Sequence, residues 1–147
     1  MRDHAWLQEQ MDFLLSKYFA NVPLTNPIEI RWGREAKYRF GSIRLITPKR
    51  GFLDLSKKEP EKSIITVTSM FKGEDVPLGV VYYTIAHELC HYAHGFSSTN
   101  KRLFKHPHHG GVINRELTER GAEALIPIFK RWLKGYRKAI MESRVKF

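Results

Sequence analysis

The stretch that decides the fold is residues 78–95, LGVVYYTIAHELCHYAHG. Apolar residues recur along it at intervals of three and four, as on one side of an α-helix. These residues are Leu78, Tyr82, Ile85, Leu89 and Tyr92. Pro77 suits the first turn of such a helix, and Gly95 suits the position just past its end. We therefore predict a helix over this stretch, with His87 and His91 lying off its apolar stripe.

Within this helix, residues 87–91 read His-Glu-Leu-Cys-His, the pattern H-E-x-x-H. Residues four apart lie on one helix face, about 6 Å apart along the axis. Two imidazoles so placed can bind one tetrahedral zinc ion, and the glutamate between them can act as a base on water. The sequence thus predicts a Zn²⁺ site with His87 and His91 as ligands and Glu88 as the catalytic residue. Cys90 is expected to be a small buried residue rather than a ligand.

A catalytic zinc ion usually has three protein ligands and a water molecule, so a third side chain is expected downstream. We favour His109, because the glycine that follows it lets a helix begin close to the metal while the imidazole points back. The other candidates are His106, His108, Glu116, Glu119 and Glu123. His94 is too far along the helix from His87 to share the metal, and we expect it beside the ligands or on the surface.

The rest of the chain carries further helix and strand patterns. Helices are predicted at 4–20, 112–120 and 126–141, and strands at 28–32, 38–46 and 64–68, with a phase slip at Gly41. The polar segments 47–62 and 96–105 are expected to be loops, the second of them mobile. We predict one α+β domain, residues 1–147, in which a sheet of three or slightly more strands packs against the metal-binding helix, flanked by N- and C-terminal helices.

The net charge of +10 favours a polyanionic partner, with DNA or another nucleic acid first and an anionic membrane surface second. The excess is concentrated in residues 101–147, which hold 12 Lys and Arg against 4 Asp and Glu. No apolar run near the N-terminus reads as a signal peptide or membrane span, and the single cysteine suits a reducing compartment. We expect an intracellular protein, cytoplasmic or, if it binds DNA, in the nucleoid or nucleus.

The motif at residues 87–91, followed by a loop and by His109-Gly110-Gly111-Val112-Ile113 leading into a helix, resembles the SprT/Spartan-type metallopeptidase family. The leading helix, the early strands and the strand before the motif are similar to that family in order over most of the chain. The resemblance implies a zincin-like fold, zinc bound by His87, His91 and His109, and Glu88 as the base. It also implies cleavage of protein substrates, some of them bound or crosslinked to DNA. We further expect strand 64–68 to line the cleft and pair with extended substrate.

Three other interpretations stay open. The small gluzincin and ImmA/IrrE-like group is similar through residues 87–94 and would take a glutamate as third ligand, with residues 119–122 imitating its later motif. A basic nucleic-acid-binding module with a structural metal would use four protein ligands, His106 or His108 among them. A hydrolase of non-peptide bonds could use the same motif. The candidate oxyanion stabilisers are Tyr82, Tyr83, Tyr92 and His94.

Overall fold

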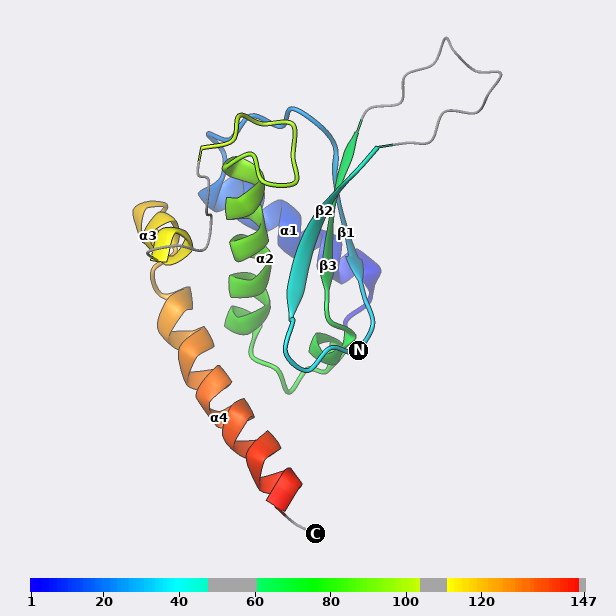
Figure 1. Ribbon diagram of the computed structural model, residues 1–147, viewed down its shortest axis with the longest axis vertical. Helices are drawn as coiled ribbons and strands as arrows, with labels where there is room; N and C mark the ends of the chain where they lie inside the picture. The colour runs from blue at the N-terminus through cyan, green and yellow to red at the C-terminus, as the bar shows by residue number, and fades with distance from the viewer. Residues whose placement is uncertain (48–60, 104–110, 146–147) are drawn as a thin grey trace, which may run out of the picture.

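The computed structural model describes residues 1–47, 61–103 and 111–145. Its elements are α1 (His4–Tyr18), β1 (Ile28–Trp32), β2 (Gly41–Ile46), β3 (Lys62–Val67), the 3-10 helix η1 (Ser69–Lys72), α2 (Leu78–Ala93), α3 (Val112–Glu119) and α4 (Leu125–Val145). In Figure 1, α2 runs alongside the three strands, and α4 descends past the end of α2 towards the C-terminus. The α+β class and all the predicted helices and strands are confirmed, with changes at some boundaries.

The three strands form a mixed sheet in the order β1-β3-β2, with β1 parallel and β2 antiparallel to β3. Ile30, Ile65 and Ile43 are register partners, so their side chains share one face, and all three are buried. α1 packs on β1, and α2 packs on β2 and β3. Arg31 and Arg44 have the opposite parity and are exposed. The alternation therefore places α2 against one apolar face of the sheet.

The strand predicted to line the cleft, β3, is the central strand, so that prediction is wrong. β3 is hydrogen-bonded on one side to β1 and on the other to β2, which leaves it no edge for a substrate. Within the described residues, β2 pairs with β3 alone and has an open edge. β2 also starts beside α2, because a Cβ added to Gly41 would lie 2.7 Å from the Thr84 methyl carbon.

α2 is buried on nearly all sides rather than along one stripe. Leu78, placed on the predicted stripe, is 43% exposed, whereas Val80, Val81 and Ala86 off the stripe are fully buried. The reason is that α2 contacts α1, α3, α4 and the sheet, so almost every side of it meets another element. No helix in the described ranges has the length and apolar character needed to span a bilayer.

The predicted strand 38–46 begins only at Gly41, after the phase slip. Phe40 lies outside the strand, where its ring packs edge-on against Trp132 of α4 at 5.3 Å between centroids. Tyr136 of α4 donates a hydrogen bond to the carbonyl of Lys37 at 2.8 Å. These contacts hold the segment before β2 against α4, and so bring α4 to the same end of the sheet as Gly41.

Candidate metal centre and active site

The predicted ligands His87 and His91 lie one turn apart on α2, and their imidazole rings are neighbours. The ring centroids are 4.9 Å apart, and the ring planes are inclined at 69°. His91 is buried, 2% exposed, whereas His87 is half-buried and lines a pocket. Rings this close can reach one metal ion together, since zinc–nitrogen bonds are about 2.0–2.1 Å long.

The C-terminal end of α2 is a Schellman motif that fixes the backbone at His91. Gly95 adopts the left-handed conformation, with φ of 76°, and its amide donates to the Tyr92 carbonyl at 3.1 Å. The Phe96 amide donates to the His91 carbonyl at 2.9 Å, and the Phe96 ring lies 5.3 Å from the His91 imidazole between centroids. Gly95 thus ends the helix as predicted, and Phe96 covers the imidazole of His91.

Hydrogen bonds, most of them buried, fix the loop after α2 to the rest of the domain. The Tyr92 hydroxyl donates to the Asn26 carbonyl at 2.9 Å, and the Asn26 side-chain amide donates to the Ser63 hydroxyl at 2.9 Å. Ser63 in turn donates to the Ser97 carbonyl at 2.7 Å, and the Ser98 hydroxyl donates to the Tyr92 carbonyl at 2.8 Å. Residues 96–103 are therefore anchored at several points, at odds with the mobile loop that their polar sequence predicted.

Glu88 faces the pocket that His87 lines. The pocket has a volume of about 260 Å³ and lies between α2, α4 and the start of β2. Glu88 is 7% exposed, and this burial raises the pKa of its carboxyl group to about 7, although the Arg39 guanidinium acts in the opposite direction. A carboxyl group that titrates near neutrality can both accept and release a proton at pH 7.

The predicted third ligand lies in a part of the chain that the structure does not describe. His106, His108 and His109 all lie there, and within residues 1–47, 61–103 and 111–145 no three His, Cys, Asp or Glu side chains converge as a metal site. Of the glutamate candidates, Glu119 and Glu123 are exposed, and Glu116 is bound to Arg120. The described residues do not bring these glutamates together with His87 and His91, and a glutamate as third ligand stays an untested alternative.

The start of α3 returns the chain to α2 close to the two histidines. The hydroxyl of Tyr83, one turn before His87, donates a hydrogen bond to Asn114 Oδ1 at 2.7 Å. Asn114 lies in the first turn of α3, a few residues after the segment that contains His109. Asn114 thus joins α3 to α2 one helical turn before His87. His109 itself lies outside the described residues, and its role as third ligand stays a prediction.

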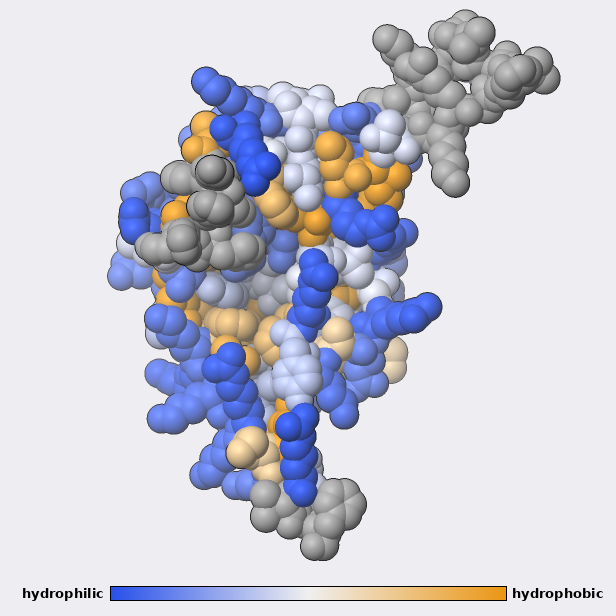
Figure 2. Space-filling model, in the orientation of Figure 1, coloured by the Kyte–Doolittle hydropathy of each residue, from blue (hydrophilic) through white to orange (hydrophobic). Residues whose placement is uncertain are grey.

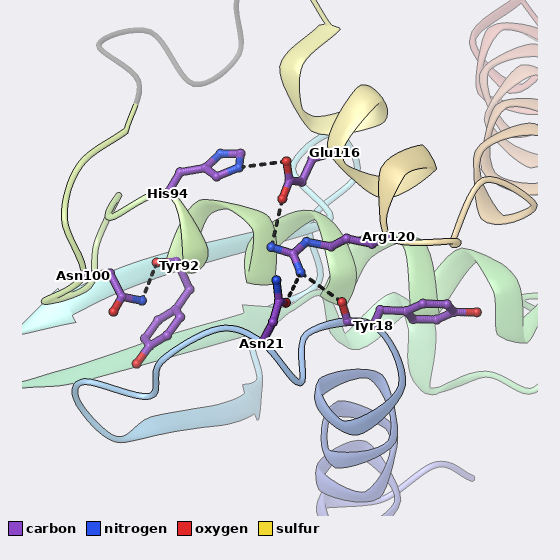
Figure 3. Close-up of polar contacts among 7 residues, drawn as sticks. All are labelled: Tyr18, Asn21, Tyr92, His94, Asn100, Glu116 and Arg120. Atoms are coloured by element: carbon purple, nitrogen blue, oxygen red, sulfur yellow. Dashed lines mark hydrogen bonds and ion pairs between the residues drawn. The ribbon is translucent and has the colours of Figure 1, made fainter.

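His94 is buried, 2% exposed, so the surface position considered for it is wrong. Figure 3 shows it at the end of α2, where its Nε2 lies 3.6 Å from Glu116 Oε2. Glu116 Oε1 accepts a hydrogen bond from Arg120 at 2.8 Å. Arg120 also donates to the Tyr18 carbonyl at 3.0 Å and to Asn21 Oδ1 at 2.8 Å. Burial lowers the pKa of His94, and its imidazole lies between α2 and α3, beside Glu116.

Two of the candidate oxyanion stabilisers are occupied elsewhere. Tyr82 donates to Gln10 of α1 at 2.8 Å, and Tyr92 is fully engaged with Asn26 in the core. Tyr83 does line the pocket, beside His87. Cys90 is buried as predicted, and burial raises the pKa of its thiol to about 12, with the Glu116 carboxylate adding to the shift.

The sequence reasoning missed the contribution of Arg39, Gly41 and Phe129 to the site. Gly41 carried a signal, because the break in alternation there marked a special position, but nothing in the pattern linked it to Glu88. Phe129 read as part of the apolar face of the last helix, which it is, and its ring also reaches the pocket. Arg39 and Gly41 come from the segment at the start of β2 and Phe129 comes from α4, so only the fold brings them together with Glu88.

Comparisons with protein-family models, with curated proteins and with solved structures gave no match. The resemblance to the SprT/Spartan-type family therefore rests on the H-E-x-x-H motif, the later His109-Gly110 pair and the order of helices and strands. The functional argument consequently depends on the chemistry of the residues around α2.

Proposed function

We propose that this chain is a zinc-dependent endopeptidase that uses Glu88 as its general base. The observation that carries the proposal is a buried carboxyl group, Glu88, that lines the same pocket as His87, whose imidazole neighbours that of His91. The proposed zinc ligands are His87, His91 and His109. Three imidazoles that leave one position open are a donor set typical of catalytic zinc.

The chain's own residues would handle the protons. Zinc bound by the three histidines would polarise the carbonyl of the scissile peptide and acidify a water molecule. Glu88 takes a proton from the attacking water on a carboxylate oxygen and then donates it to the nitrogen of the departing amine. Both transfers would take place at the pocket that Glu88 lines together with His87.

The open edge of β2 is the proposed place for the substrate backbone. A Cβ added to Gly41, the first residue of β2, would lie 3.4 Å from Glu88 Oε1, so the strand begins next to the proposed base. An extended peptide can add to an exposed strand edge through main-chain hydrogen bonds. A peptide that adds to β2 would therefore pass the carboxyl group of Glu88.

We also propose that DNA associates with α4. Its exposed residues include a row of cations, and in Figure 2 blue hydrophilic side chains project along this helix with apolar atoms between them. The cations are Lys130, Arg131, Lys134, Arg137, Lys138 and Arg144. Because α4 also contributes Phe129 to the pocket, DNA bound there would lie near the proposed site of cleavage. This favours proteins carried on DNA as substrates.

The test is the zinc content of the purified protein together with its cleavage of casein and histones, with and without DNA. We expect about one zinc ion per chain and a loss of cleavage by a factor of about 10²–10⁴ in Glu88→Gln, with zinc retained. Glu119→Gln is the matched control, since it changes an exposed carboxyl group on α3 and should alter neither property.

A different experimental result would contradict each part of the proposal. Cleavage that DNA does not stimulate would remove DNA from the proposal and leave the peptidase. Full zinc with no cleavage under any condition would favour the nucleic-acid-binding module with a structural metal. Loss of zinc in Glu119→Gln would restore a glutamate as the third ligand.

A further inference from the structure

We infer that the pocket beside Glu88 binds one large apolar side chain of the substrate, from a residue next to the bond that is cut. The inference rests on the proposed function, since it names the substrate residue that the same site selects. The pocket has a volume of about 260 Å³, which suits a single side chain rather than a folded segment. Its walls include the rings of Phe40, Tyr83 and Phe129, and such walls favour an apolar occupant.

The aromatic walls are fixed by packing. The rings of Tyr83 and Phe129 are stacked, with centroids 4.2 Å apart and planes inclined at 16°. Phe40 meets Phe129 edge-on at 6.2 Å between centroids and is itself packed against Trp132 at 5.3 Å. The pocket is therefore formed before a substrate arrives, and an incoming ring or branched side chain would find aromatic edges and faces already in place.

Gly41 and Thr84 keep this pocket open. A Cβ at residue 41 would lie 2.7 Å from the Thr84 methyl carbon, closer than non-bonded carbons approach. The positive-φ glycines in the described residues are Gly95, Gly111 and Gly121, so Gly41 is not required by its backbone conformation. What the glycine provides is room between the start of β2 and α2, beside the carboxyl group of Glu88.

The charges at the pocket do not suit an acidic occupant. Arg39 is exposed at the pocket, and the carboxyl group of Glu88 is part of the same lining. An acidic substrate side chain would meet the same carboxyl group at short range, which is unfavourable for like charges. An uncharged apolar side chain avoids this repulsion and gains contact with the three rings.

The experiment maps cleavage sites in a proteome-derived peptide mixture by mass spectrometry, using zinc-loaded wild type, Gly41→Ala and Phe129→Leu. For wild type we expect Phe, Tyr, Leu or Met beside the cut, preferred over Ala by at least about tenfold in kcat/KM. Gly41→Ala should narrow the pocket and shift the preference towards smaller residues. Phe129→Leu should remove a wall and weaken the preference for aromatic residues.

The matched control is Gly79→Ala. A Cβ at Gly79 would lie 2.8 Å from Ile128, a similar intrusion between α2 and another element, but Gly79 does not line the pocket. The Gly79→Ala protein should prefer the same residues beside the cleaved bond as wild type. If Gly41→Ala folds poorly, adding Thr84→Ser removes the methyl group that the new Cβ would strike, and the shift in preference can then be measured.

A preference for small or acidic residues in wild type, or one that Gly41→Ala and Phe129→Leu both leave unchanged, would overturn the inference. A second measurement separates this from failure of the proposed function. Glu88→Gln should bind an alanine hexapeptide with one central phenylalanine at least about tenfold more tightly than the all-alanine peptide. If zinc-loaded wild type cleaves nothing while this selectivity is present, the peptidase proposal fails and the pocket assignment stands. Equal binding of the two peptides overturns the pocket assignment.

Discussion

Glu88 on α2 and Glu116 on α3 are two carboxyl groups with opposite surroundings. Glu88 lies inside a pocket and, among the described residues, makes no ion pair within 4.0 Å; the burial raises its pKa to about 7. Glu116 accepts a hydrogen bond from Arg120 at 2.8 Å and lies 3.6 Å from the imidazole of His94. The Glu116 carboxyl group is held by a guanidinium group and joins parts of the structure, whereas in the described part of the chain Glu88 is buried without such a partner and faces a pocket.

The same contrast extends to the two regions of α2. The region around Glu88 has an open pocket, a half-buried His87 and a glycine where a side chain would fit poorly. The region from Tyr92 to the loop beyond Gly95 is closed by hydrogen bonds to Asn26, Ser98 and Asn100. We infer that the closed region holds His91 still, so that the open region can be left unfilled for a substrate.

The largest effect on stability is expected at Gly95, in the closed region. An alanine there would adopt an unfavourable left-handed φ, and its Cβ would lie 2.5 Å from backbone atoms of residues 100–102. We expect Gly95→Ala to lower the free energy of unfolding by about 4 kcal/mol or more. Gly121→Ala is the control, with φ of 86° but no atom within 4 Å of the added Cβ, and should cost only about 1 kcal/mol. Urea denaturation measures both, and equal losses would show that the loop does not press on Gly95.

In the metal-free protein, ionisation of the Glu88 carboxyl group in the open region should lower the free energy of unfolding. The folded state raises the pKa of Glu88 from 4.5 to about 7, so the folded protein binds the extra proton between these values. This contribution is complete below pH 4.5 and is lost as the pH rises through 7, a change of about 3 kcal/mol. In chelator-treated protein, wild type should therefore lose stability from pH 5 to 8 relative to Glu88→Gln. Parallel stability curves for the two proteins would contradict the raised pKa.

Most of the fold was predictable because each element carries a local pattern. The spacing of Leu7, Met11 and Leu14 predicted α1, and all three are buried; Gly95 ended α2 where predicted. The order of the strands was not predictable, since no local pattern says that β3 lies between β1 and β2. In the same way, the motif predicted His87, Glu88 and His91 as site residues. It could not predict the aromatic pocket, because the pocket residues come from α2, from α4 and from the segment before β2.

A smaller loss of stability is expected from a substitution at Arg120, where the closed region contacts α3. Arg120 is 12% exposed and binds Glu116, the Tyr18 carbonyl and Asn21, so it joins α3 to the end of α1 (Figure 3). Arg120→Ala removes these bonds and leaves Glu116 without its guanidinium partner, for an expected loss of about 2 kcal/mol in the free energy of unfolding. Arg131→Ala, at an exposed position on α4, should change stability by less than about 0.5 kcal/mol. Because Arg120 holds structure while Glu88 carries the proposed chemistry, Arg120→Ala should keep its zinc and its kcat at temperatures where it stays folded. A fall in kcat with unchanged stability would place Arg120 in the active site and remove the contrast between the two carboxyl groups.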